Sequence, residues 1–227
     1  AVGFFFLALT HSFTNKEFMK KTMINLNGIK NIIFDFGNVL LNINPLLSAS
    51  AFSDLGVRDG IDFWGSRSSS DLLIGLEKGS VSPDEFRKVA MQMLVPGITP
   101  QQIDQAWNAL LLDFPMKRVE KLQELRQSYR LFLLSNSNQI HYDCFMKRFE
   151  SEYGFGLDQL FEKLWFSHQL GMVKPDAAIF RHVLGDADLN PSETLFIDDT
   201  LVHVEAARLE GIHAFHLSSG LDISNLL

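Results

Sequence analysis

Short apolar runs along the chain predict the buried strands of a parallel sheet. Ile32-Ile33-Phe34 is the first such run, and it ends at Asp35. Buried parallel strands have this continuous apolar character, and open α/β sheets bind ligands beyond the carboxyl ends of their strands. Asp35 is therefore the first candidate for chemistry. Gly37, two residues later, offers a backbone carbonyl but no functional side chain.

The pattern over residues 45–114 predicts helices only. Ser82 and Thr99 each precede a proline, and each is followed three residues later by Glu85 or Gln102, which can close a capping box. Apolar residues at helical spacing follow both caps. We expect a small helical-bundle domain over this range, inserted after the first strand.

From residue 115 onward, predicted helices alternate with predicted strands. This alternation predicts an α/β fold with a doubly wound parallel sheet. The Rossmann-like core domain would cover residues 29–44 and 115–227, and residues 1–28 would form an N-terminal extension that is partly disordered. The expected strands are 131–134, 164–166, 194–197 and 212–217, and the expected helices include 119–125, a segment through Ile179 and Val183, and 202–210.

Composition narrows the class of protein. The 227 residues are 46% hydrophobic and carry a formal net charge of -7, which argues against a nucleic-acid or an anionic membrane surface. We expect a small-molecule partner and a monomer or a homodimer. The single cysteine, Cys144, excludes an internal disulfide and fits a reducing, cytoplasmic compartment. The apolar residues 4–9 are too few to span a bilayer.

Polar residues stand at the ends of three predicted strands, and a lysine precedes a predicted helix. The carboxyl ends of parallel strands meet at one edge of a sheet, so these side chains are expected to converge in one crevice. Each residue alone is typical of a helix cap, a turn or a solvated surface charge. Capping does not require all of these residue types in this order. The set is Asp35, Ser135, Asn136, Lys174, Asp198 and Asp199.

This order of motifs resembles the haloacid dehalogenase superfamily of phosphotransferases. Asp35 matches the family's nucleophile and Ser135 its second motif. Lys174 matches the third motif, and the pair Asp198 and Asp199 matches the fourth. The helical insertion is similar to the family's cap domain. The strings FDFGNVL, LSNSN, LGMVKP and FIDD are most similar to the bacterial subgroup that includes glucose-1-phosphate phosphatase.

The resemblance implies a Mg²⁺-dependent phosphatase that hydrolyses a small phosphorylated metabolite, with a sugar phosphate as the expected substrate. Asp35 would attack phosphorus to give an aspartyl-phosphate, which water then hydrolyses. Mg²⁺ would bind Asp35, Asp199 and the backbone carbonyl of Gly37. Asp198 would be a further ligand or would hold a metal-bound water.

The same resemblance assigns the phosphate contacts. Ser135 and the amide of Asn136 would hydrogen-bond the phosphoryl oxygens. Lys174 would offset the negative charge on both the phosphate and Asp35. On this basis Lys174→Ala is expected to damage catalysis far more than folding.

Gly37 departs from the family pattern. Family phosphatases usually carry a second aspartate there, which protonates the leaving oxygen and then activates water, a contribution of roughly 10²–10⁴-fold. Asn38 cannot replace it, because an amide does not titrate usefully. Three explanations stay open: the substrate has a good leaving group such as an anomeric oxygen; water, the substrate or a cap residue handles the proton; or the protein is an inactive phosphate-binding relic.

His203 is the second departure, standing where relatives often have Asp or Asn. It is interpreted as a surface or packing histidine of its helix, or alternatively as a partner or proton carrier near the metal. Substrate specificity is expected in the cap. The candidates there are Trp64, Arg67, Trp107 and Asn108, with Trp107 expected mainly in the cap core and Arg67 as a surface charge.

Other functions share parts of this pattern. A 2-haloacid dehalogenase also uses a strand-end aspartate and lacks the second acid, but it has little use for the acidic pair Asp198 and Asp199. A phospho-acceptor signalling domain combines similar residues, but the helical insertion and the motif order argue against it. A binding module that has lost turnover through Gly37 is the remaining alternative.

Overall fold

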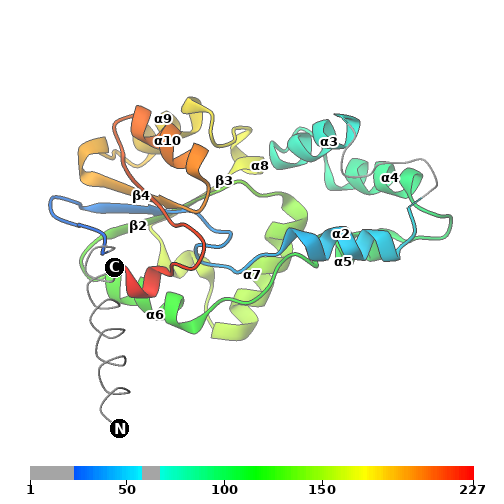
Figure 1. The fold of residues 1–227 in the computed structure, drawn as a ribbon, viewed down its shortest axis with the longest axis horizontal. Coiled ribbons are helices and arrows are strands. Elements are labelled where there is room, and N and C mark those ends of the chain that lie inside the picture. The colour runs from blue at the N-terminus through cyan, green and yellow to red at the C-terminus, as the bar shows by residue number, and fades with distance from the viewer. Residues whose placement is uncertain (1–22, 58–66) are drawn as a thin grey trace, which may run out of the picture.

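The structure, a computed structural model, describes residues 23–57 and 67–227, with the backbone alone for residues 67–70. The apolar run 4–9 and the candidate Trp64 lie outside the described residues, as does the side chain of Arg67. Figure 1 shows the described chain as a sheet with helices around it and a separate group of helices to one side. Among the described residues, no helix has both the length and the apolar character that a membrane crossing needs.

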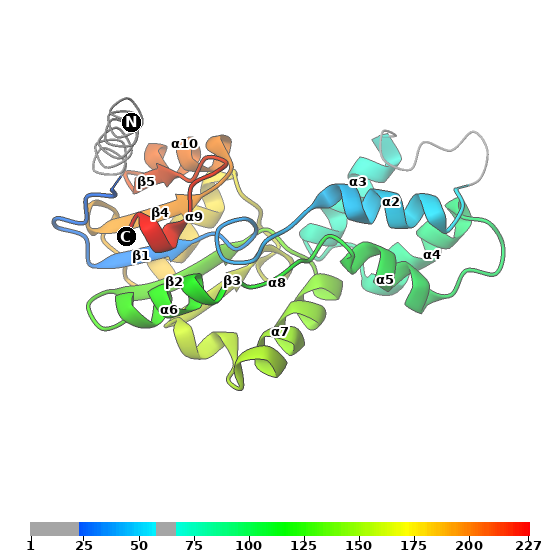
Figure 2. The ribbon, with the colours of Figure 1, turned by 60° about the horizontal axis from the view of Figure 1, so that its bottom comes forward.

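In the described part of the chain, the core is a sheet of five parallel strands in the order β3-β2-β1-β4-β5 (Figure 2). The chain builds the sheet outward from β1 through β2 to β3, and then returns to place β4 on the other side of β1. This reversal confirms the doubly wound sheet and puts a topological switch point between β1 and β4. The strands are β1 (Asn31–Phe34), β2 (Arg130–Ser135), β3 (Lys163–Phe166), β4 (Thr194–Asp198) and β5 (His213–His216).

Apolar side chains fill both faces of the sheet. Ile32 and Phe34 belong to a cluster with α6 and α7, whereas Ile33 belongs to a cluster with α9 and α10. Successive strand residues point to opposite faces, so a strand covered on both sides is apolar throughout. The helices of the core are α6 (Met116–Leu125), α7 (Gln139–Tyr153), α8 (Ser167–Leu170), α9 (Ala177–Asp186) and α10 (Leu201–Leu209), with short 3₁₀ turns η1 (Leu157–Leu160), η2 (Pro191–Glu193) and η3 (Ile223–Asn225).

The helices between β1 and α6 have an apolar cluster of their own, which includes Phe52, Phe86 and Ile103. We call this group of helices the cap. It occupies the insertion expected over residues 45–114, and both expected capping boxes are formed; the domain division itself stays a prediction. The cap helices are α2 (Pro45–Asp54), α3 (Arg67–Glu77), α4 (Pro83–Met93) and α5 (Pro100–Asn108).

Two segments differ from the sequence-based expectations. The sequence pattern does not predict helix α7, because its apolar side chains do not lie on one face of the helix. Ile140 packs into the cap cluster, while Phe145 and Phe149 pack into the core. Residues 23–28 were assigned to the extension, yet Ile24 donates its backbone N–H to the carbonyl of Leu226 at 3.0 Å. The described part of that segment therefore packs with the core.

Ser82→Ala is expected to destabilise the cap. Ser82 Oγ accepts from the backbone N–H of Glu85 at 3.2 Å, and the Glu85 carboxylate accepts from the backbone N–H of Ser82 at 2.8 Å. Loss of the hydroxyl should lower the free energy of unfolding by about 1 kcal/mol in urea denaturation. Ser82→Gly is the matched control and should cost only about 0.3 kcal/mol, because glycine is tolerated at this position. Equal losses for both variants would contradict the capping role.

Candidate active site

A buried ammonium group stands at the centre of the site. Lys174 Nζ donates to Asp35 Oδ1 at 2.5 Å and to Asp198 Oδ2 at 2.7 Å. Its third hydrogen bond goes to the backbone carbonyl of Leu134 at 3.0 Å, so all of its donors are used. The two aspartates meet there because they follow β1 and end β4, which are neighbours at the switch point.

These three charges shift one another's pKa values. Burial raises the pKa of Asp35 to about 7, against the opposing effect of Lys174, and the neighbouring Asp198 adds to the rise. Burial also acts to raise the pKa of Asp198, but Lys174 and His203 lower it to about 2. Burial acts to lower the pKa of Lys174, and the two carboxylates raise it above its usual value. Lys174 and His203 thus favour the ionised form of Asp198.

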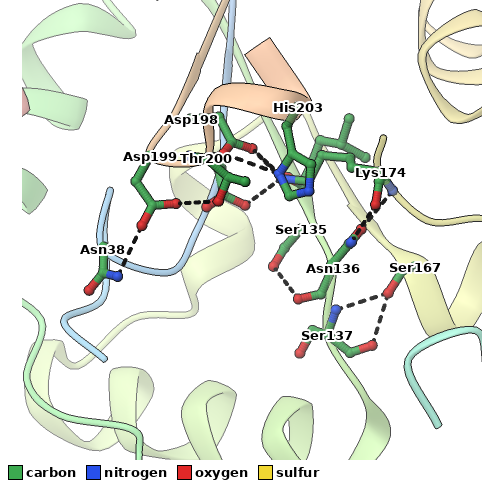
Figure 3. Close-up of polar contacts among 12 residues, drawn as sticks. Asn38, Ser135, Asn136, Ser137, Ser167, Lys174, Asp198, Asp199, Thr200 and His203 are labelled. Atoms are coloured by element: carbon green, nitrogen blue, oxygen red, sulfur yellow. Dashed lines mark hydrogen bonds and ion pairs between the residues drawn. The ribbon is translucent and has the colours of Figure 1, made fainter. Parts of the chain in front are cut away.

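The acidic pair that follows Ile197 is held from several sides (Figure 3). Asp198 Oδ1 accepts from the backbone N–H of Thr200 at 2.7 Å, and His203 Nδ1 lies 3.1 Å from Asp198 Oδ2. Asp199 Oδ1 accepts from the Thr200 hydroxyl at 3.2 Å. The protein itself therefore orients both carboxylates. His203 thus contacts Asp198 of the acidic pair directly, and its role beside a metal stays a prediction.

Three carboxylates come close enough together to hold a metal ion. Asp35, Asp198 and Asp199 each offer an oxygen, and these oxygens lie within 4.8 Å of one another. The Lys174 ammonium between the first two supplies one positive charge beside three carboxylates, so the group retains negative charge that a divalent cation would offset. Hard oxygen donors of this kind suit Mg²⁺. The residues present therefore fit such an ion.

The polar residues that end β2 flank this centre. Ser135 is buried, and its hydroxyl donates to the carbonyl of Asn136 at 3.3 Å. The Asn136 side chain accepts from the backbone N–H of Lys174 and donates to the Lys174 carbonyl, each at 2.9 Å. Asn136 thus fixes the backbone of the lysine as well as ending the strand. The structure thus brings the polar residues expected from the strand ends, together with Lys174, to one edge of the sheet.

Asn38 has a structural role that sequence analysis missed. Its backbone is left-handed, with φ of 56°, a conformation that asparagine tolerates better than most residues. The side chain donates to Asp199 Oδ2 at 3.0 Å and accepts from the backbone N–H of Ile43 at 3.3 Å. The signal in the sequence was the Gly37-Asn38 pair, which is typical of a tight turn.

The described cap candidates lie near α7. Trp107 is mostly buried and stacks on His141, with ring centroids 4.9 Å apart, and its indole N–H donates to Asn138 at 3.3 Å. Asn108 Oδ1 lies 2.9 Å from Nδ1 of the same histidine. Both residues therefore join α5 of the cap to α7 of the core. Their role in specificity stays a prediction.

Comparison with known proteins finds a matching hydrolase family and similar phosphatases. A family model described as haloacid dehalogenase-like hydrolase matches residues 29–211. The chain is 34% identical to D-ribitol-5-phosphate phosphatase from Bacteroides thetaiotaomicron, over 86% of this chain and 94% of that protein. It is 30% identical to sesquiterpene phosphatase astK from Aspergillus oryzae, over 85% of this chain and 91% of that protein.

A solved structure is similar over nearly the whole of its own chain. It is a haloacid dehalogenase family enzyme from Bacteroides thetaiotaomicron in complex with magnesium and inorganic phosphate. The TM-score is 0.79 at 33% identity, over 88% of this chain and 99% of that one. The resemblance to the subgroup of glucose-1-phosphate phosphatase stays a prediction.

Lys174→Ala is expected to destabilise the fold measurably, in addition to the larger damage to catalysis. The Lys174 side chain is 1% exposed, and its removal leaves the carboxylates of Asp35 and Asp198 without the ammonium group that lies between them. We expect a loss of about 3 kcal/mol in the free energy of unfolding, measured in urea. Lys163→Ala is the control: its ion pair with Asp186 is partly exposed and should be worth less than about 1 kcal/mol. Similar losses for the two variants would contradict this account of the buried lysine.

Proposed function

The chain belongs to the haloacid dehalogenase-like hydrolases, and from this premise we propose that it is a Mg²⁺-dependent phosphatase of small phosphate monoesters. The observation that supports the proposal most strongly is the buried lysine between Asp35 and Asp198, with Asp199 completing a group of three carboxylates. Phosphoryl transfer requires a positioned nucleophile and positive charge around the phosphoryl oxygens. These residues offer both.

Asp35 is the nucleophile of the proposed reaction. Its carboxylate oxygen bonds to phosphorus while the ester bond breaks, which gives an aspartyl-phosphate, and water then hydrolyses this intermediate. Lys174 stays within hydrogen-bond distance of Asp35 and offsets charge on the transferring group. The Ser135 hydroxyl and the backbone amide of Asn136 bind the phosphoryl oxygens.

The proposed metal ligands are Asp35, Asp199 and the backbone carbonyl of Gly37. Mg²⁺ bound there would supply positive charge to the phosphoryl oxygens, and would let a carboxylate approach a dianion. Asp198 already accepts hydrogen bonds from Lys174 and Thr200. We therefore assign it to orienting the lysine beside the metal rather than to a full place among the ligands.

The substrate class that we propose is a phosphorylated sugar or sugar alcohol. The relative named D-ribitol-5-phosphate phosphatase supports this class at 34% identity over most of both chains. The net charge of -7 is also better suited to a small substrate than to a polyanionic polymer.

A phosphate-release screen tests the proposal. The purified protein with Mg²⁺ is offered sugar phosphates, sugar-alcohol phosphates, nucleotides, flavin mononucleotide and acyl phosphates. We expect release from at least one sugar or sugar-alcohol phosphate, loss of release with a chelator, and recovery when Mg²⁺ is added back. Halide release from 2-haloacids that is insensitive to the chelator would instead identify a dehalogenase, and a flat panel would favour the phosphate-binding relic.

Asp35→Asn is the matching variant. It removes the nucleophile with little change of shape, and should lower kcat on the best substrate by on the order of 10⁴-fold or more. Asp71→Asn is the control, since Asp71 is an exposed acid of the cap and its loss changes the net charge equally. If Asp35→Asn kept full activity, the mechanism would be wrong.

A further inference from the structure

A cavity of about 220 Å³ lies between the cap and the sheet edge. Gly37, Ser135 and Asn136 line it from the core, and Glu77 and Trp107 line it from the cap. The first three include a proposed metal ligand and both proposed phosphate contacts, so the cavity adjoins the point where phosphorus would react. The alcohol part of a substrate would therefore extend toward the cap.

Glu77 is the one carboxylic acid among the described residues that line this cavity. Much of the remaining lining is apolar, and Glu77 itself is half-buried. The local sequence pattern around Glu77 does not distinguish it from a surface residue at the end of a helix. The apolar residues of the lining are Phe36, Leu41, Ile43, Leu110, Leu111 and Phe145, together with Pro45 and Trp107.

Close contact between α3 and α8 brings Glu77 to the core (Figure 1). Gly79 follows the helix with a left-handed φ of 70°, and a Cβ atom there would lie 2.1 Å from the backbone oxygen of His168. Only glycine permits this approach of the two backbones. Lys78 Nζ adds an ion pair to Asp176 Oδ2 at 3.7 Å. The end of α3 is therefore docked on the segment that carries the third motif.

The surroundings of Glu77 suit a group that alternates between acid and base. Burial raises the pKa of its carboxyl, and the charges of His203 and Lys174 oppose this rise. A carboxyl shifted in this direction retains a proton more readily than a surface glutamate does. General acids are expected to have pKa values moved toward the working pH.

The other titratable group of the lining is less suited to this role. His141 is almost fully buried, and burial lowers the pKa of its imidazole to about 3. Its Nδ1 lies 2.9 Å from Asn108, and its ring stacks on Trp107. Such a histidine stays neutral and structural, so it does not supply a proton to a leaving group at neutral pH.

We propose that Glu77 is the general acid and base of the reaction, in place of the acid that the chain lacks at Gly37. This inference rests on the proposed phosphatase function. As Asp35 bonds to phosphorus, the bond to the ester oxygen breaks; its electron pair passes to that oxygen, which takes the proton of Glu77. Water then attacks phosphorus and gives its proton to Glu77, and the electron pair of the breaking bond returns to Asp35.

This assignment favours one of the three explanations for Gly37. With a cap acid in place, the substrate needs no exceptional leaving group such as an anomeric oxygen. An ordinary primary alcohol, as in a sugar-alcohol phosphate, leaves readily once it is protonated. The proton donor and the nucleophile then come from separate parts of the fold.

A comparison of leaving groups tests the role of Glu77. The substrates are p-nitrophenyl phosphate, whose leaving group is stable as an anion, and the sugar or sugar-alcohol phosphate that the wild-type protein hydrolyses fastest. Glu77→Gln should lower kcat/KM about 100-fold on the alkyl ester and no more than about threefold on the aryl ester, because only the alkoxide needs a proton. Activity on the aryl ester also reports that the variant is folded.

Two variants serve as controls. Asp71→Asn removes an exposed carboxylate from the same helix and should leave both activities unchanged. Asp35→Asn should lose both, and if it retained them the proposed function would fail rather than the role of Glu77. Equal losses on the two esters in Glu77→Gln, or no loss on either, would overturn the assignment of the general acid.

Discussion

A buried ammonium group must be compensated, and the rest of the site depends on how this chain meets that requirement. Lys174 is almost fully enclosed, so Asp35 and Asp198 have to lie within hydrogen-bond distance of it. Adjacent strands at the switch point bring the two acids together, and Asn136 fixes the lysine backbone between them. Asp199 is a third carboxylate beside this single ammonium group, so the same edge of the sheet carries excess negative charge that a metal cation would offset.

The residues of this charge centre could be predicted from the sequence because parallel strands impose a strict geometry. An apolar run that ends in a polar residue locates a strand end, and strand ends share one edge. Asp35, Ser135 and Asp198 were therefore expected together despite their separation along the chain. Lys174 lies between strands, and its inclusion depended on the order of the motifs rather than on periodicity. The structure places it at the centre of the group.

The remaining features depend on contacts that no local pattern encodes. Asn38 acts through a left-handed turn that aims its amide at Asp199. His203 lies on α10, and its ring nitrogen Nδ1 is 3.1 Å from Asp198 Oδ2. The apolar residues of helix α7 do not recur at a regular helical spacing, because some pack into the apolar cluster of the cap and others into that of the core. Glu77 becomes relevant only when the cap docks on the core, and docking between two units is the least predictable step from sequence alone.

The missing Cβ of Gly79 has a consequence for the order of events in a catalytic cycle. The backbones of Gly79 and His168 approach so closely that any separation of the cap from the core at this point also withdraws Glu77 from the sheet edge. Exchange of substrate and product through such a separation would occur while the nucleophile has no proton donor beside it. Admission of the substrate and transfer of the proton would then occur at different times, and the rate of opening and closing at this contact would set an upper limit on turnover.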